Sequence, residues 1–207
     1  MTPVAGLGDI RLHLAAPSSG LSRLVGGDTP YWAYKWAGGL ALAHHLRVHP
    51  DLVAGRRVLD MGAGSGLVGI AAAKAGADRV LAVESDRNGR AAIPLNAALN
   101  GVNVSLVDLG LDDDGAFPDI DLILVGDLFY AADLARRVTG FLDRALAAGI
   151  DALVGDPGRI PLPTARLEEL ARYDVVESGN RPTPSAVYRF APAFVEQDGL
   201  ARGSVAS

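Results

Sequence analysis

Short apolar runs recur along this chain, and most are separated by stretches with helical periodicity. Runs of this kind are typical of strands buried on both faces of a parallel sheet. They lie at Val58 to Met61, Val80 to Val83, Val102 to Val107, Leu122 to Val125 and Ala152 to Val154. Because strands and helices alternate, the pattern predicts an α/β fold, a doubly wound, mostly parallel sheet with helices on both faces.

Five segments have the apolar spacing of helices: Leu40 to Val48, Leu67 to Ala75, Arg90 to Leu99, Ala132 to Ala147 and Thr164 to Arg172. Asn100-Gly101 and Gly149 are typical residues for helix ends. Pro94 lies inside the third segment, where a proline removes a hydrogen bond and clashes with the preceding turn. We therefore expect that helix to be kinked or to start late.

The C-terminal part of the chain predicts two further strands, Asp174 to Glu177 and Ala186 to Phe190, joined by the turn-rich residues 178–184. They would form an antiparallel hairpin at the sheet edge and bring the sheet to seven strands. We expect residues 1–29 to be an N-terminal extension and residues 30–192 to be a single domain. Residues 193–207 are small and polar, which favours a flexible tail.

Composition excludes several classes of function. The formal net charge is −5, from 19 basic and 24 acidic residues. With no basic run, binding to a nucleic-acid backbone is not expected. The absence of cysteine excludes disulfides, thiolate catalysis and cysteine-ligated zinc, and we expect no metal site. No apolar stretch approaches ~18 residues and no signal-peptide pattern is present, so we expect a cytoplasmic protein without membrane contact.

Three glycines at alternate positions, Gly62, Gly64 and Gly66, follow Asp60 at the end of the first buried strand. Because glycine has no Cβ, the backbone of such a turn can lie directly against a ligand. Glu84 ends the next apolar run and is placed to accept hydrogen bonds from ribose hydroxyls. Asp86 would take that place if the strand ran longer. The pattern predicts a nucleoside-binding site rather than an ordinary tight turn.

Two cofactors are compatible with these glycines. Gly64, Gly66 and Gly69 satisfy the G-x-G-x-x-G spacing of dinucleotide-binding sites. Gly64, however, lies two residues beyond the position directly after the strand where the first glycine of that motif is expected. Counted from Gly62, the spacing G-x-G-x-G resembles the class I S-adenosylmethionine-dependent methyltransferases, which have a Rossmann-like sheet. The resemblance implies that the loop lies beneath the methionine and ribose of S-adenosylmethionine. Asp108 follows the third strand, where the family often contacts adenine, although a simple turn-forming acid explains it equally well.

The fourth strand ends in Gly126-Asp-Leu-Phe-Tyr130, on the side of the sheet where ligands collect. We include Gly126 among the cofactor-binding residues. Asp127 alone is explained as a helix cap, but a cap does not require Tyr130 three residues later. The pair resembles the D-x-x-Y motif of the seven-strand lysine methyltransferases. This resemblance implies that Asp127 and Tyr130 are the catalytic residues.

The chemistry of methyl transfer to an amine is consistent with this pair. The amine must attack in its neutral form, whereas free lysine has a pKa near ~10.4. A nearby carboxylate raises that pKa and a sulfonium lowers it, so we assign Asp127 to binding and orienting the amine. Tyr130 would line the channel and add a cation–π or hydroxyl contact. No histidine is placed as a base, since solvent-facing or capping roles are favoured for His44, His45 and His49.

The segment Tyr31-Trp-Ala-Tyr-Lys-Trp36 concentrates four aromatic residues just before the N-terminal helix. A core plug and a wall of the ligand pocket are equally good interpretations. Together with residues 126–130 and with Gly155-Asp-Pro-Gly-Arg159, it resembles the electron transfer flavoprotein β-subunit lysine methyltransferases and their bacterial relatives, over residues 30–190. The resemblance implies that Trp36 lies near the cofactor and that the loop through Asp156 and Arg159 borders the substrate entrance. That loop is also a good turn, and Arg159 could simply pair with a carboxylate.

Three hypotheses follow. The first is a protein-lysine N-methyltransferase that uses S-adenosylmethionine and acts on the electron transfer flavoprotein β subunit. The second keeps methyl transfer but replaces the protein with a small amine or heterocycle such as nicotinamide. The third is a non-catalytic nucleoside-binding module or an NAD-dependent oxidoreductase, although no separate acid or base for hydride transfer is evident.

Overall fold

A computed structural model describes residues 2–4, 6–15, 21, 30–177 and 181–192. Within these residues, seven strands form one sheet in the order β5-β4-β3-β6-β7-β9-β8. Their bounds are β3 Arg57–Met61, β4 Arg79–Val83, β5 Ser105–Leu106, β6 Leu122–Gly126, β7 Asp151–Asp156, β8 Leu167–Val175 and β9 Thr183–Phe190. Neighbouring strands from β5 to β7 are parallel, and β9 is antiparallel to both β7 and β8. The predicted sheet and its C-terminal hairpin are confirmed.

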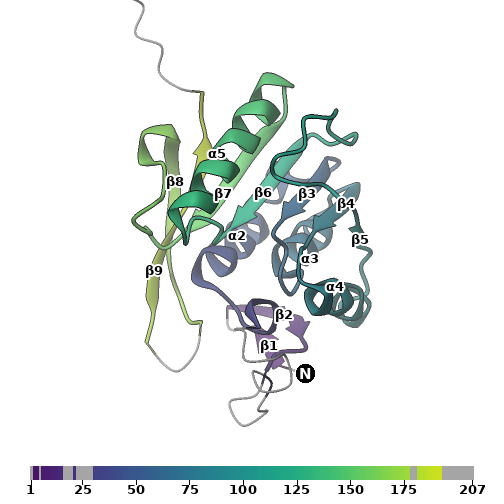
Figure 1. Cartoon of the computed structure of the whole chain (residues 1–207). Helices are drawn as coiled ribbons and strands as arrows, with labels where there is room; N and C mark the ends of the chain where they lie inside the picture. Colours follow the sequence, from purple (N-terminus) through teal and green to yellow (C-terminus); the bar gives the residue numbers. More distant parts are fainter. Residues whose placement is uncertain (1, 5, 16–20, 22–29, 178–180, 193–207) are drawn as a thin grey trace, which may run out of the picture.

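Helices cover both faces of the sheet, with α5 on one face and α2 and α3 on the other (Figure 1). The helices are α2 Ala37–Val48, α3 Leu67–Lys74, α4 Arg87–Leu99 and α5 Ala132–Ala147, with 3-10 turns η1 Tyr31–Ala33, η2 Pro50–Leu52 and η3 Thr164–Arg166. Successive residues of β3 enter different cores: Val58 packs with α2 and α3, and Leu59 packs with α5. This alternation explains why the central strands are apolar at nearly every position.

The described part of residues 1–29 includes a second, two-stranded antiparallel sheet of β1 (Thr2–Val4) and β2 (Leu7–Leu12). Leu7, Ile10 and Leu12 are buried in the same core as α2 and α3. The amide of Arg11 donates to Asn100 Oδ1 at 2.9 Å, at the end of α4. These residues are therefore joined to the domain by apolar packing and by hydrogen bonds. The predicted tail of residues 193–207 lies outside the described residues.

The prediction of a helix at Thr164 to Arg172 is wrong. Only η3 is helical there, and residues 167–175 form β8. The segment Leu167-Glu-Glu-Leu-Ala-Arg172 consists of good helix formers, but β9 offers a complete antiparallel partner for it. Tertiary pairing thus decides the conformation of this segment against its local preference.

Other boundaries also differ from the predictions: the hairpin strands cover residues 167–175 and 183–190 rather than 174–177 and 186–190. Helix α4 does not start late: it begins at Arg87 despite Pro94, because the carboxylate of Asp86 accepts bonds from the amides of Asn88 and Gly89. Strand β5 has two residues rather than the predicted six. The amide of Val102 donates to Ala97 O at 3.1 Å, so the start of the predicted strand instead closes the end of α4.

The prediction that His45 faces solvent is wrong, because its side chain is buried between α2 and β8. Its Nδ1 lies 2.8 Å from the Tyr173 hydroxyl, within hydrogen-bond distance. Burial is the main reason why its pKa falls to about 4. His45 is thus a neutral core residue. His49 occupies the C-cap position of α2, as expected.

Candidate active site

The glycine loop joins β3 to α3 at the carboxyl end of the sheet. Gly62, Gly64 and Gly66 all have left-handed backbone conformations, with φ values of 70°, 54° and 82°. A Cβ built on Gly62 would lie 2.5 Å from Cδ2 of Leu128, closer than van der Waals contact allows. Residues with a Cβ are therefore disfavoured here both by conformation and by space.

Glu84 lies directly after β4 and beside this loop. Its Oε2 accepts a bond from the amide of Gly64 at 2.7 Å, and its Oε1 accepts one from the amide of Asp86, also at 2.7 Å. Asp86 is itself occupied as the N-cap of α4. Of the two candidate acids, Glu84 therefore adjoins the glycine loop, whereas Asp86 has a structural partner of its own.

Asp60 is buried beneath the glycine loop near the end of β3, and its Oδ2 accepts from the amide of Gly69 at 2.7 Å. Burial raises its pKa to about 7; the hydrogen bond from the Gly69 amide opposes this rise, and the charge of Glu84 adds a smaller increase. Asp60 thus ties the first turn of α3 to the strand that precedes the loop.

Asp127 lies directly after β6 and is the non-glycine residue with a left-handed backbone in the described part of the chain, with φ of 59°. Its Oδ2 accepts from the amide of Gly39 at 2.7 Å, and its Oδ1 accepts from Nη2 of Arg159 at 2.9 Å. Burial raises its pKa to about 6, although the Gly39 amide and Arg159 act in the opposite direction. Sparsely populated backbone conformations of this kind are concentrated at functional sites.

The N-terminus of α2 reaches Asp127 because of two glycines, Gly38 and Gly39, whose role was not predicted from the sequence. A Cβ on Gly38 would lie 2.1 Å from Gly155 O, so the helix can approach β7 this closely only without a side chain there. The next residue, Gly39, then presents its free amide to Asp127. The signal was available as a Gly-Gly pair at the start of an apolar helix, where helix formers are otherwise expected.

The aromatic segment lies at the surface beside the site rather than in the core. Tyr31 stacks on Tyr130, with ring centroids 5.8 Å apart and planes 13° apart, and both side chains are about half exposed. Trp36 contacts the rings of both Tyr31 and Tyr34, and its Nε1 donates to Tyr31 O at 2.8 Å. These contacts favour the interpretation that the aromatic segment is a wall of the ligand pocket over the interpretation that it is a core plug.

A narrow cavity of about 50 Å³ lies between the aromatic segment, the glycine loop and Asp127. Its lining includes six of the predicted site residues: Trp36, Asp60, Gly62, Gly64, Gly126 and Asp127. Gly66 and Glu84 adjoin the cavity through the glycine loop. Tyr130 stacks on Tyr31, which in turn contacts the lining residue Trp36. Asp108 does not join this group: its side chain is 90% exposed and pairs with Arg90 at 3.0 Å.

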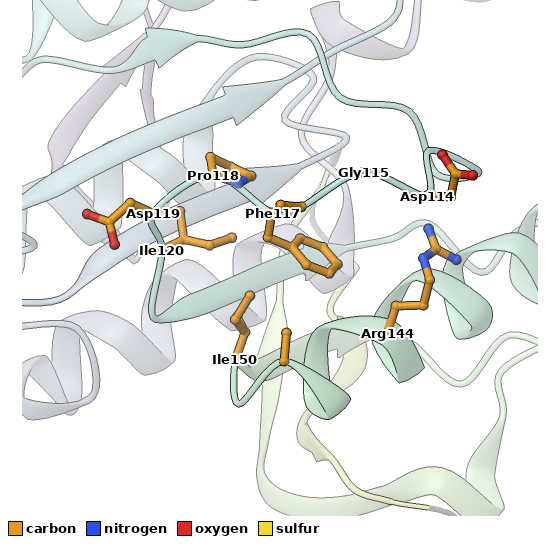
Figure 2. A pocket seen from close by; sticks show the side chains of 10 residues that line it. Asp114, Gly115, Phe117, Pro118, Asp119, Ile120, Arg144 and Ile150 are labelled. Atoms are coloured by element: carbon orange, nitrogen blue, oxygen red, sulfur yellow. The ribbon is translucent and has the colours of Figure 1, made fainter.

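A larger hollow of about 550 Å³ lies at the opposite, amino end of β6 and β7 (Figure 2). It is lined by the loop of residues 114–120 together with Arg144, Ala148 and Ile150. Arg144 donates to the carbonyls of Leu111 and Asp113, so its guanidinium is occupied by the protein. Ligands of open α/β sheets bind at the carboxyl ends of the strands, so the narrow cavity is the candidate active site.

The residues of the narrow cavity fit a nucleoside cofactor. The glycine loop offers a backbone surface without side chains, and Glu84 offers carboxylate oxygens beside it. The Cα of Trp32 lies 3.8 Å from a Cβ built on Gly64, and its Nε1 is buried without a hydrogen-bond partner. The backbone of Trp32 thus adjoins the glycine loop, and its indole N–H has no acceptor in the protein.

Comparison with known proteins identifies the family. A lysine methyltransferase of the electron transfer flavoprotein β subunit from Rattus norvegicus is 39% identical over 175 residues, covering 79% of this chain and 68% of that protein. The Xenopus laevis protein of the same name is 37% identical over 202 residues, covering 89% and 80%. This chain belongs to that family of class I S-adenosylmethionine-dependent methyltransferases.

Two further matches agree with the methyltransferase fold. The model of the ribosomal protein L11 methyltransferase family (PrmA) matches residues 46–130, which include the glycine loop and the D-x-x-Y motif. A Pyrococcus abyssi tRNA (uracil-54, C5)-methyltransferase in complex with S-adenosyl-L-homocysteine has the same fold. The two structures superimpose with a TM-score of 0.53 at 21% sequence identity. The match covers 72% of this chain and 38% of the other chain. The predicted enzyme class and the predicted cofactor, S-adenosylmethionine, are confirmed.

In the part of the chain that the structure describes, helices long and apolar enough to cross a membrane are absent.

Proposed function

We propose that this methyltransferase transfers methyl groups from S-adenosylmethionine to lysine side chains of the electron transfer flavoprotein β subunit. The observation that carries the proposal is the position of Asp127, a buried carboxylate in a left-handed backbone conformation on the wall of the cofactor cavity. The names of the relatives that cover most of this chain support the choice of substrate. A cytoplasmic location remains a prediction.

The side chains around the cavity account for the binding of an amine. When bound, S-adenosylmethionine supplies a methyl group on a sulfonium, which a neutral amine can attack in line. Asp127 attracts the ammonium form of the lysine and holds its nitrogen near the glycine loop; the ammonium releases a proton to solvent before the neutral amine attacks, and the amide of Gly39 keeps the carboxylate in place. The stacked rings of Tyr31 and Tyr130 offer aromatic faces for the alkyl chain and the cation.

The surface near the site supports a protein substrate rather than a small molecule. Ile160 is 99% exposed, one residue after Arg159, which contacts Asp127. Tyr130, three residues after Asp127, and Tyr31, which stacks on it, are each about half exposed. Exposed aliphatic and aromatic side chains beside a site that binds an amine are typical of surfaces that bind a partner protein.

The test is methylation of the recombinant β subunit by the purified protein with labelled S-adenosylmethionine, followed by mass mapping of modified lysines. The proposal expects mass increments on lysine with wild-type enzyme and none with Asp127→Asn. A parallel reaction offers a panel of small amines and heterocycles that includes nicotinamide. Label in the panel and none in the protein would refute the proposed substrate. Calorimetry is expected to show binding of S-adenosylhomocysteine and no binding of NAD.

A further inference from the structure

Arg159 lies between two buried carboxylates, those of Asp127 and Asp156. Asp156 ends β7, and its side chain is fully buried. Its Oδ1 accepts from the amides of Gly158 and Arg159 at 2.7 and 2.8 Å. Its Oδ2 has no hydrogen-bond partner although it is buried, and the same is true of Nε of Arg159. These two unpaired atoms are 3.9 Å apart.

Buried polar atoms are rarely left unpaired, and a charged pair that falls short of a hydrogen bond is unusual. Closing the gap between Nε of Arg159 and Oδ2 of Asp156 by about 1 Å would create a charge-assisted hydrogen bond. In the structure, Arg159 instead donates from Nη2 to Oδ1 of Asp127 at 2.9 Å. Arg159 thus pairs fully with Asp127 and incompletely with Asp156.

The pairing with Asp127 conflicts with the binding of an amine. Oδ2 of Asp127 is held by the amide of Gly39, and Oδ1 is held by Arg159. A lysine ammonium that approaches this carboxylate must therefore compete with a guanidinium of the same charge. The unpaired oxygen of Asp156 provides the guanidinium with another acceptor nearby.

We propose that Arg159 is a positioning residue that exchanges carboxylates during substrate binding. Without substrate it pairs with Asp127, and when a lysine amine occupies Asp127 it turns to Oδ2 of Asp156. This inference rests on the proposed function, since it takes the amine to bind at Asp127. Asp156 thereby becomes a determinant of lysine affinity although it does not contact the substrate.

The variant Asp156→Asn isolates this role. Asparagine keeps an oxygen for the amides of Gly158 and Arg159, so the turn is retained, but it places an NH₂ group where Oδ2 was. Arg159 then has no acceptor to move to. The Michaelis constant for the lysine substrate is expected to rise about tenfold, while kcat and the affinity for S-adenosylhomocysteine change less than about twofold.

The control is the same substitution in an Arg159→Ala background. With the guanidinium absent, Asp156→Asn is expected to leave the Michaelis constant unchanged, because nothing needs to be displaced. An equal rise in both backgrounds would show that Asp156 acts through the loop and would overturn the proposal. The melting temperatures of all four proteins identify any variant that fails to fold.

A second readout does not depend on turnover. The Nε–H resonance of Arg159 in a ¹⁵N spectrum, assigned with Arg159→Lys, reports whether Nε gains a partner. With S-adenosylhomocysteine bound, n-butylamine, a mimic of the lysine side chain, is expected to shift it in the wild type and not in Asp156→Asn. Amine binding that depends on Asp127 but leaves this resonance unmoved would refute the exchange alone. If no amine binds and no lysine is methylated, the proposed function itself fails.

Discussion

Asp60 provides a quantitative test of the physics of this site, because the enzyme keeps a buried carboxyl group beneath its cofactor loop. The substitution is Asp60→Asn, which preserves the shape of the side chain and an oxygen for the amide of Gly69. Burial moves the pKa of Asp60 from 3.8 to about 7 in the folded protein. The unfolded chain has the ordinary value, so folding favours the protonated acid.

The sign and size of the effect follow from linkage. Between pH 5 and about 7 the native state holds the proton that the unfolded state has lost, so the wild type loses stability as the pH rises. Two pKa units at 1.36 kcal/mol each correspond to about 3 kcal/mol. Asparagine does not titrate, so the variant escapes this loss. Asp127, whose pKa is also raised, titrates in both proteins, so its contribution to the free energy of unfolding cancels in the difference between them.

The measurement is urea unfolding of both proteins, followed by circular dichroism at pH 5 and pH 8. The free energy of unfolding of Asp60→Asn relative to the wild type should increase by about 3 kcal/mol from the lower to the higher pH. Asp114→Asn, in an exposed loop, serves as the control and should show no such change. The same relative stability at both pH values for Asp60→Asn would refute the reasoning, since it would mean that native Asp60 is already ionised at pH 5.

Four further predictions concern activity and binding. Asp127→Asn should lower kcat by about 100-fold or more and leave the affinity for S-adenosylhomocysteine unchanged in calorimetry; a loss of cofactor affinity would show that its role is misassigned. Because burial raises the pKa of Asp127 to about 6, the fall of wild-type kcat/KM with pH should steepen by about a further tenfold per pH unit below that value, beyond the fall caused by protonation of the lysine, and an unchanged slope from pH 5 to 7 would contradict a role for ionised Asp127. Gly62→Val should abolish binding of S-adenosylhomocysteine because its side chain would clash with Leu128, whereas Gly140→Ala, which has open space around it, should bind normally. Ile160→Asp should raise the Michaelis constant for the β subunit about tenfold without changing that for n-butylamine; equal changes for both would exclude a docking role for Ile160.

The central strands and the glycine loop could be predicted because each depends on short-range rules. Strands β3 and β6 match the predicted runs to within a residue at each end, since a strand buried on both faces is apolar at nearly every position. The loop could be recognised because left-handed backbone at Gly62 and Gly66 excludes most other residues.

The conformation of residues 167–172 could not be predicted in the same way. Their local preference is helical, and only the presence of β9 alongside makes them a strand. His45 was likewise assigned to solvent because a histidine on a helix is polar by type. Its burial depends on Tyr173, which is 128 residues away in the chain.

The sequence by itself determined the sheet, the glycine loop and the identities of the acids that the chemistry needs, because apolar patterning and steric limits act between neighbours along the chain. The partners of those acids were decided only by the tertiary structure. Gly39 and Arg159 reach Asp127 from α2 and from the loop after β7, at separations of 88 and 32 residues. Whether a carboxylate is buried, held or free to bind an amine depends on such contacts, and the local pattern does not identify the partners: the Gly38-Gly39 pair signals a close approach without showing what is approached.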